Sequence, residues 1–204
     1  MKPDVVRYPI VSLDAFVAKF HDVQNGIIAA QIISHDNRIG QKAEILDAYS
    51  HTYYEDFRLP DTDEIKDLKK RIVETVEDIT GKPYRMTESW SIILEPGQSI
   101  SFHNHHVGQV AEPNEYFAFA YYPFAPEGSC DLQFLATHSN VVTSTVTVPV
   151  STGTLIIFNS YLYHWTHRQG GVSARVNVSG NLVPANPTVT SHDDWSHYEE
   201  ANNA

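Results

Sequence analysis

The sequence is poor in cysteine and in basic residues, and it has no long apolar run. The single cysteine, Cys130, excludes an internal disulfide framework and is typical of a reducing compartment. Lysine and arginine number 14 against 25 acidic residues, so the net charge is −11, which disfavours nucleic-acid and anionic-membrane partners. No apolar run approaches the ~20 residues of a membrane span. We therefore expect a cytoplasmic protein without a membrane partner.

Size and composition predict one globular domain. Apolar residues make up 42% of the 204 residues and charged residues 19%, which is enough for one sizeable core. We expect a single domain over residues 1–190. Within it, residues 1–83 form a helical support region and residues 84–183 form a β core. The polar and acidic residues 191–204 form a C-terminal tail.

Three helices are expected in the support region. Ser12 is a suitable N-cap for the first helix. The apolar residues of this helix recur at helical spacing and are Leu13, Phe16, Val17 and Phe20. A second helix is expected over residues 27–33. A third helix begins at a capping box of Asp61 and Glu64, and it ends at Gly81.

Beyond residue 84 the chain becomes a series of short β-like runs, which are separated by turns rich in Gly and Pro. The expected strands cover residues 90–94, 116–122, 132–135, 141–148, 154–158 and 174–182. Regular short strands after a helical start predict a β-barrel or sandwich with helices on its outside.

Histidine clustering is the first chemical signal. His103 and His105 point to the same face if they lie on a strand, because side chains alternate with period two. This pair and a third imidazole from a distant strand can provide three ligands on one side of a metal ion. The opposite side stays open for substrate. The neighbouring His106 and His167 are expected to lie outside the first ligand shell or at the surface.

Arg175 lies inside an apolar β run, where an unpaired guanidinium is expensive to bury. Val176 and Val178 point to the alternate face, so Arg175, Asn177 and Ser179 point together to one side. If that side is the interior of the barrel, an anionic ligand supplies the missing counter-charge. The planar fork of Arg175 matches a carboxylate. If this run is instead an edge strand, Arg175 lies in solvent or pairs with an aspartate.

These residues also form an ordered pattern along the chain. Five residues separate Gly97 from His103. Ten residues separate Gly153 from His164, and ten more separate His164 from Arg175. This arrangement resembles the Fe(II)- and 2-oxoglutarate-dependent oxygenases, whose pattern is a turn Gly, His-x-Asp/Glu, a distal His and an Arg about ten residues later. The segments ESW, AYYP and FNSYLYH are similar to a His-x-His subgroup found in bacteria and cyanophage-type viruses.

The resemblance implies a double-stranded β-helix, which is a jelly-roll of the cupin-like kind. It implies iron ligands His103, His105 and His164, and it implies that Arg175 holds the distal carboxylate of 2-oxoglutarate. Asn177 and Tyr121 are expected to add hydrogen bonds to this cosubstrate, although only one of Tyr121 and Tyr122 can face inward. The implied cofactors are Fe(II), 2-oxoglutarate and O2, with ascorbate as an addition. The implied reaction hydroxylates a protein, peptide or small molecule and releases succinate and CO2.

The sequence departs from the usual pattern at one ligand. His105 occupies the position of the carboxylate, so three neutral imidazoles leave the full charge on Fe(II). The carboxylate ligand otherwise comes from elsewhere in the chain, and the candidates are Glu112, Glu115 and Asp131. A shifted alignment on His106 resembles the halogenating relatives, in which a halide takes the place of the carboxylate.

Two other functions stay open. A three-His cupin-type dioxygenase uses the same ligands without 2-oxoglutarate, but it gives Arg175 no purpose, and the spacing from Gly153 to His164 is long for a cupin. The other is a non-catalytic β-barrel, such as a binding or virion-associated module, that keeps some histidines.

Overall fold

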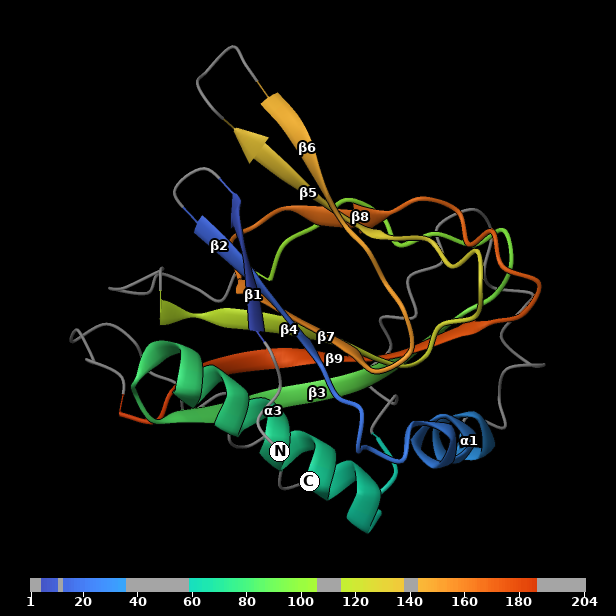
Figure 1. Ribbon diagram of the computed structural model, residues 1–204, viewed down its shortest axis with the longest axis horizontal. Coiled ribbons are helices and arrows are strands. Elements are labelled where there is room, and N and C mark those ends of the chain that lie inside the picture. Colours follow the sequence, from blue (N-terminus) through green and yellow to red (C-terminus); the bar gives the residue numbers. More distant parts are fainter. Residues whose placement is uncertain (1–4, 11–12, 36–58, 106–114, 138–142, 187–204) are drawn as a thin grey trace.

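The computed structural model describes residues 5–10, 13–35, 59–105, 115–137 and 143–186 (Figure 1). Strands come first in the chain and helices follow before the main body of strands. The strands are β1 (Val5–Ile10), β2 (Leu13–Lys19), β3 (Tyr84–Leu94), β4 (Phe117–Phe124), β5 (Leu132–Thr137), β6 (Thr143–Val148), β7 (Thr154–Asn159), β8 (His164–Thr166) and β9 (Arg175–Pro184). The helices are α1 (Asn25–His35) and α3 (Asp63–Thr80).

The strands form two antiparallel sheets. The larger sheet has the order β1-β2-β7-β4-β9-β3, and the smaller has the order β6-β5-β8. Figure 1 shows the larger sheet between the two helices on one side and the smaller sheet on the other. The fold is therefore mainly β with N-terminal helices and a jelly-roll, cupin-like core, as the sequence predicts.

The larger sheet is buried on both faces, which its strand β4 illustrates. The residues of β4 that pack in the helix-side core are Phe117, Phe119 and Tyr121. The residues of β4 that pack in the core between the sheets are Ala118, Ala120 and Tyr122. Because both faces are covered, β4 reads as a continuous apolar run, and the sequence alone does not tell its two faces apart.

The helix expected over residues 13–20 is wrong, because residues 13–19 form β2. Phe16 packs against the helix-side core and Val17 against the core between the sheets, which is the period of a strand. β2 pairs with β7, with Ala18 opposite Leu155. Residues four apart share a face in a strand as well as in a helix, so the spacing of Phe16 and Phe20 fits both, and pairing with β7 decides.

The two later helices are confirmed, with one correction. The structure extends the helix expected over 27–33 to α1. α3 ends at Gly81, whose φ of 70° is left-handed, as expected of a C-cap. The N-cap is Thr62 rather than Asp61, because the Thr62 hydroxyl accepts a hydrogen bond from the Ile65 backbone N–H at 3.4 Å. Glu64 accepts one from Gln31 of α1 and closes no capping box.

The six expected strands are confirmed as β3, β4, β5, β6, β7 and β9, with shifts of a few residues at their ends. The short strand β8 was not expected. Residues 141–142 and the tail 191–204 lie outside the described residues. No helix in the described part of the chain combines the length and the apolar composition needed to cross a membrane.

Gly180 lies where β3, β4 and β9 crowd together, so Gly180→Ala tests the packing of the large sheet. A Cβ there would collide with the carbonyl oxygen of Glu88 and lie 2.6 Å from a ring carbon of Phe119. We expect a loss of roughly 1–3 kcal/mol or more in the free energy of unfolding, measured by urea titration. The control is Gly26→Ala on α1, where nothing lies within 4 Å and the change should be neutral or stabilising. Equal urea midpoints for both variants would contradict the packing.

Candidate metal centre

The structure brings His103, His105 and His164 together. His103 and His164 form an antiparallel bridge, with backbone N–O distances of 3.1 and 2.8 Å. His105 is held by its backbone N–H, which donates to the Ser160 carbonyl at 2.8 Å. One ligand atom from each of the three side chains lies within 4.8 Å of the other two. The His-x-His spacing thus places both imidazoles on one face, opposite the distal histidine.

Backbone carbonyls fix the ring orientation of two of these histidines. The Nδ1 of His103 lies 2.8 Å from the carbonyl oxygen of Ser101, and the Nδ1 of His164 lies 2.9 Å from that of Leu162. A carbonyl oxygen only accepts hydrogen bonds, so each Nδ1 carries the hydrogen. The lone pair of each neutral ring is then on Nε2, which is the atom that a metal binds.

For His105, a side chain rather than a backbone carbonyl fixes the orientation of the ring. Its Nδ1 lies 2.6 Å from the Oδ1 of Asn181 on β9, and the Asn181 amide donates in turn to Glu88 on β3. The Trp90 ring packs against the imidazole with a centroid distance of 5.5 Å. His105 is therefore held by its backbone, by one hydrogen bond and by ring contact.

Burial keeps two of the three imidazoles neutral. It lowers the pKa of His105 to about 4; the bond to Asn181 opposes this change and the proximity of His103 adds to it. Burial also lowers the pKa of His164 well below its ordinary value, and the neighbouring imidazoles of His105 and His103 lower it further. Neutral histidines are the form that binds metal, so the cluster is ready to accept a cation at neutral pH.

Arg175 is fully buried on the interior face of β9, where it lies against Cys130 and Tyr122. Its Nη1 donates to the Cys130 carbonyl at 2.8 Å and contacts the Cys130 sulfur at 3.2 Å. Its Cζ lies 5.1 Å from the ring centroid of Tyr122. Nε and Nη2 have no hydrogen-bond partner among the described residues. A buried cation with two unused donors is what an anionic ligand would complete.

A cavity lies next to the three histidines. Its lining is mostly apolar, with two polar residues from β9. The lining residues are Trp90, Ile92, Ile100, His103, His105, Phe119, Ala120, Tyr122, Leu132, Phe158, His164, Asn177 and Ser179. Asn177 donates to the Ser179 hydroxyl at 2.9 Å, and its own Oδ1 has no partner among the described residues. The alternation expected from the sequence thus turns Asn177 and Ser179 toward the interior, together with Arg175.

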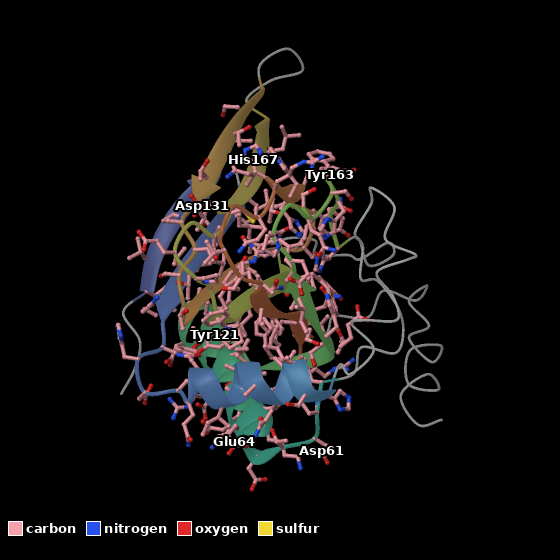
Figure 2. All side chains as sticks on the ribbon, turned by 90° about the vertical axis from the view of Figure 1, so that its right-hand side faces the viewer. Asp61, Glu64, Tyr121, Asp131, Tyr163 and His167 are labelled. Atoms are coloured by element: carbon pink, nitrogen blue, oxygen red, sulfur yellow. The ribbon has the colours of Figure 1, made fainter. Side chains whose placement is uncertain are left out.

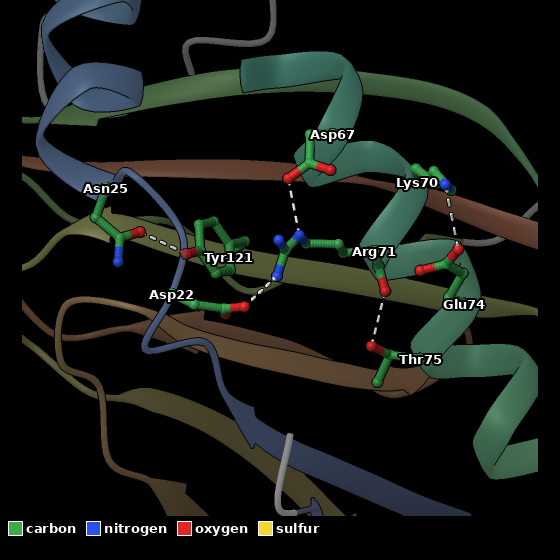
Figure 3. A network of polar contacts seen from close by, with 8 residues as sticks. All are labelled: Asp22, Asn25, Asp67, Lys70, Arg71, Glu74, Thr75 and Tyr121. Carbon is green, nitrogen blue, oxygen red and sulfur yellow. Dashed lines mark hydrogen bonds and ion pairs between the residues drawn. The ribbon is translucent and has the colours of Figure 1, made fainter. Parts of the chain in front are cut away.

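The expectation for Tyr121 is corrected. Tyr121 lies on the opposite face of β4, where its hydroxyl donates to Asn25 of α1 (Figures 2 and 3). Tyr122 lines the cavity instead, because adjacent residues of a strand face opposite ways. Burial raises the pKa of Tyr122 to about 12, so its hydroxyl remains protonated and able to donate a hydrogen bond.

No carboxylate of the described residues belongs to the three-histidine group. Glu115 forms an ion pair with Lys82, and Asp131 accepts a hydrogen bond from a backbone N–H at 2.9 Å. The other candidates, Glu112 and His106, lie outside the described residues. Within the described part of the chain, the third member of this group is thus His105.

Asn181 and Glu88 were not among the expected site residues. Asn181 continues the two-residue period of Arg175, Asn177 and Ser179, and this signal could have identified it. His167, labelled in Figure 2, is exposed and does not belong to the three-histidine group, as expected.

No family model and no curated protein matches the sequence. Solved structures do share its fold. EvdMO1 aligns with a TM-score of 0.61 and 16% identity over 83% of this chain, which spans about half (47%) of EvdMO1. A non-heme monooxygenase, ThoJ, in complex with nickel has a TM-score of 0.58 and 12% identity, over 92% of this chain and 77% of ThoJ.

A third similar structure is HygX from Streptomyces hygroscopicus with nickel and 2-oxoglutarate bound. Its TM-score is 0.51 and its identity 14%, over 90% of this chain and 84% of HygX. At these identities the similarity establishes the fold that the chain shares with these proteins.

The buried histidines predict how stability depends on pH in the metal-free protein. The pKa of His105 is about 4 when folded and ordinarily about 6.5, so the unfolded chain binds more protons between these values. The free energy of unfolding should therefore fall as pH falls from 7 toward 4. We expect His105→Gln to reduce this slope in urea titrations with a chelator present, whereas His167→Gln at the exposed site should not. Equal slopes for all three proteins would contradict the account.

Proposed function

We propose that the protein is an Fe(II)- and 2-oxoglutarate-dependent dioxygenase. It would hydroxylate an unidentified protein, peptide or small molecule and release succinate and CO2. The observation that carries this proposal is the unused edge of the buried Arg175 guanidinium, in a domain that also brings three imidazoles together. An anionic cosubstrate explains the unused edge, and a metal explains the convergence of the imidazoles.

The donor set fits Fe(II). Imidazole nitrogens suit iron, zinc, copper and nickel, and three of them on one side leave other positions open. His103, His105 and His164 would hold the ion through Nε2. Three neutral ligands leave its double charge uncompensated, which favours binding of an anion beside it. When bound, iron and 2-oxoglutarate supply the oxidative chemistry with O2.

Arg175 fits the distal carboxylate of 2-oxoglutarate. Cys130 occupies only Nη1, while Nε and Nη2 together form one edge of the guanidinium. This edge matches two carboxylate oxygens at once, and the pair would compensate a buried charge that has no other counter-ion among the described residues. Asn177 keeps a second amide hydrogen for the same ligand, and the Tyr122 hydroxyl is a further donor in the role expected of Tyr121.

The apolar lining of the cavity has a separate proposed role, which is to control the access of water. The cavity beside the histidines is lined by the Trp90 ring, Leu132 and Phe158. They would exclude bulk water from the oxidising centre and leave the reacting part of the substrate in an apolar environment. We infer that the reacting carbon belongs to an uncharged portion of the substrate.

The three-histidine cluster also fits a second function. Because the described cluster consists of three histidines without a carboxylate, a three-His dioxygenase that works without 2-oxoglutarate fits the metal site equally well. It leaves the buried donors of Arg175 without a function, so we place it second. A non-catalytic binding module explains neither the histidines nor Arg175.

The proposal predicts a visible metal-to-ligand charge-transfer band when metal-free protein is titrated anaerobically with Fe(II) and then with 2-oxoglutarate. His164→Ala should abolish the band because it removes one ligand. Arg175→Lys keeps the charge but loses the guanidinium edge, and should weaken 2-oxoglutarate binding roughly 10- to 100-fold. The matched control is Arg168→Lys at an exposed position, which should leave the titration unchanged.

Two outcomes would overturn the proposal. Tight Fe(II) binding without a band would favour the three-His dioxygenase. Absence of Fe(II) binding would leave a β-barrel with structural histidines.

A further inference from the structure

We infer that Glu88 is a positioning residue for the metal centre, because through Asn181 it sets which ring nitrogen of His105 faces the metal. This inference rests on the proposed metal site. Glu88 is not itself one of the proposed ligands, and it acts along one chain of hydrogen-bonded side chains.

The three residues form a continuous path from the surface to the cluster. His105 and Asn181 are 9% and 5% exposed, and Glu88 is at the surface. Glu88 lies directly opposite Asn181 in the pairing of β3 with β9, so both side chains lie on the same face of the sheet. Asn181 donates through Nδ2 to Glu88, and its Oδ1 lies 2.6 Å from the Nδ1 of His105.

An irregularity in β3 creates this register. Met86 pairs with Leu182 and Glu88 pairs with Asn181, so Thr87 is an extra residue in the strand. Without this bulge, Thr87 would lie opposite Asn181 and no carboxylate would reach the amide. Bulges next to functional sites commonly re-aim a side chain in this way.

The direction of the hydrogen bonds follows from chemistry. An ionised carboxylate only accepts, so Glu88 requires the NH2 group of Asn181 on its side. The carbonyl oxygen of Asn181 must then face His105, and it also only accepts. The His105 Nδ1 therefore carries the hydrogen, and the lone pair of the neutral ring is on Nε2.

His105 is the ligand that needs this control. The Nδ1 atoms of His103 and His164 bond to backbone carbonyls, whose oxygens cannot exchange places with a donor. The Asn181 amide can rotate by half a turn and present NH2 to His105 instead. That rotation would place the hydrogen of His105 on Nε2 and remove a metal ligand. Glu88 makes the rotated state unfavourable.

The first test is the affinity of the metal-free protein for Co(II), measured by competition with a chromophoric chelator. Glu88→Gln keeps the size of the side chain but allows it to donate as well as accept. We expect Co(II) affinity to fall roughly 10- to 100-fold, the usual effect of losing a partner of a metal-bound histidine. Glu74→Gln on α3, where Glu74 pairs with Lys70, removes the same charge and should leave the affinity unchanged.

A second readout needs no metal. In the metal-free protein, the ring 15N chemical shifts of His105 should report hydrogen on Nδ1, and Glu88→Gln should shift them toward the other tautomer. The shifts of His103 and His164 should stay the same in both proteins, because their partners are backbone carbonyls. A merely structural role of Glu88 would not move one ring selectively.

The double variant Glu88→Gln with Asn181→Asp tests the direction of the bonds. The carboxylate at position 181 accepts from the His105 Nδ1, and the amide at position 88 donates to that carboxylate. We expect Co(II) affinity to return to within about threefold of the native protein. Failure to recover would assign the loss in the single variant to packing and overturn the inference.

Two further outcomes distinguish failure of the role of Glu88 from failure of the proposed metal site. If the native protein and Glu88→Gln bind Co(II) equally tightly with unchanged His105 shifts, the inference is wrong and the metal site stands. If the native protein does not bind Co(II), the metal site itself is wrong, and the inference is overturned with it.

Discussion

The candidate site depends on one constraint, which is that β9 carries polar side chains into a closed interior. Its alternate residues, which face the helices, are apolar and complete the helix-side core. Its interior residues are Arg175, Asn177, Ser179 and Asn181, and all four are buried. Burying polar groups is unfavourable unless each finds a partner. The structure satisfies Asn181 through His105 and Glu88, whereas Arg175 keeps two unused donors. One strand thus supports the imidazole cluster at one position and presents a buried cation at another.

The charges of the site are complementary in a way that defines its ligands. Burial keeps His105 and His164 neutral, so the cluster attracts a cation, and the described residues contribute no carboxylate to it. Arg175 attracts an anion. A single molecule with a carboxylate at each end, bound to a metal at one and to Arg175 at the other, would satisfy both requirements. For this reason we propose 2-oxoglutarate rather than a neutral cosubstrate.

The sequence predicted those parts of the site that depend on local periodicity. The two-residue spacing of His103 and His105 placed both on one face, and the same period turned Arg175 and Asn177 inward. It did not separate Tyr121 from Tyr122, because β4 is buried on both faces and either aromatic residue fits either core. It also mistook residues 13–19 for a helix, since pairing with β7 is a long-range contact. The bond from Asn181 to Glu88 needed a bulge that no local pattern reveals.

The central claim is a metal centre of three imidazoles, and X-ray absorption spectroscopy of the Fe(II)-loaded protein tests it most directly. Scattering from the outer atoms of the imidazole rings gives the number of histidine ligands, with or without 2-oxoglutarate. The account predicts three imidazoles per iron in the native protein and two in His105→Ala. A native spectrum with two imidazoles and a carboxylate from the protein, or a His105→Ala spectrum identical to the native one, would contradict it.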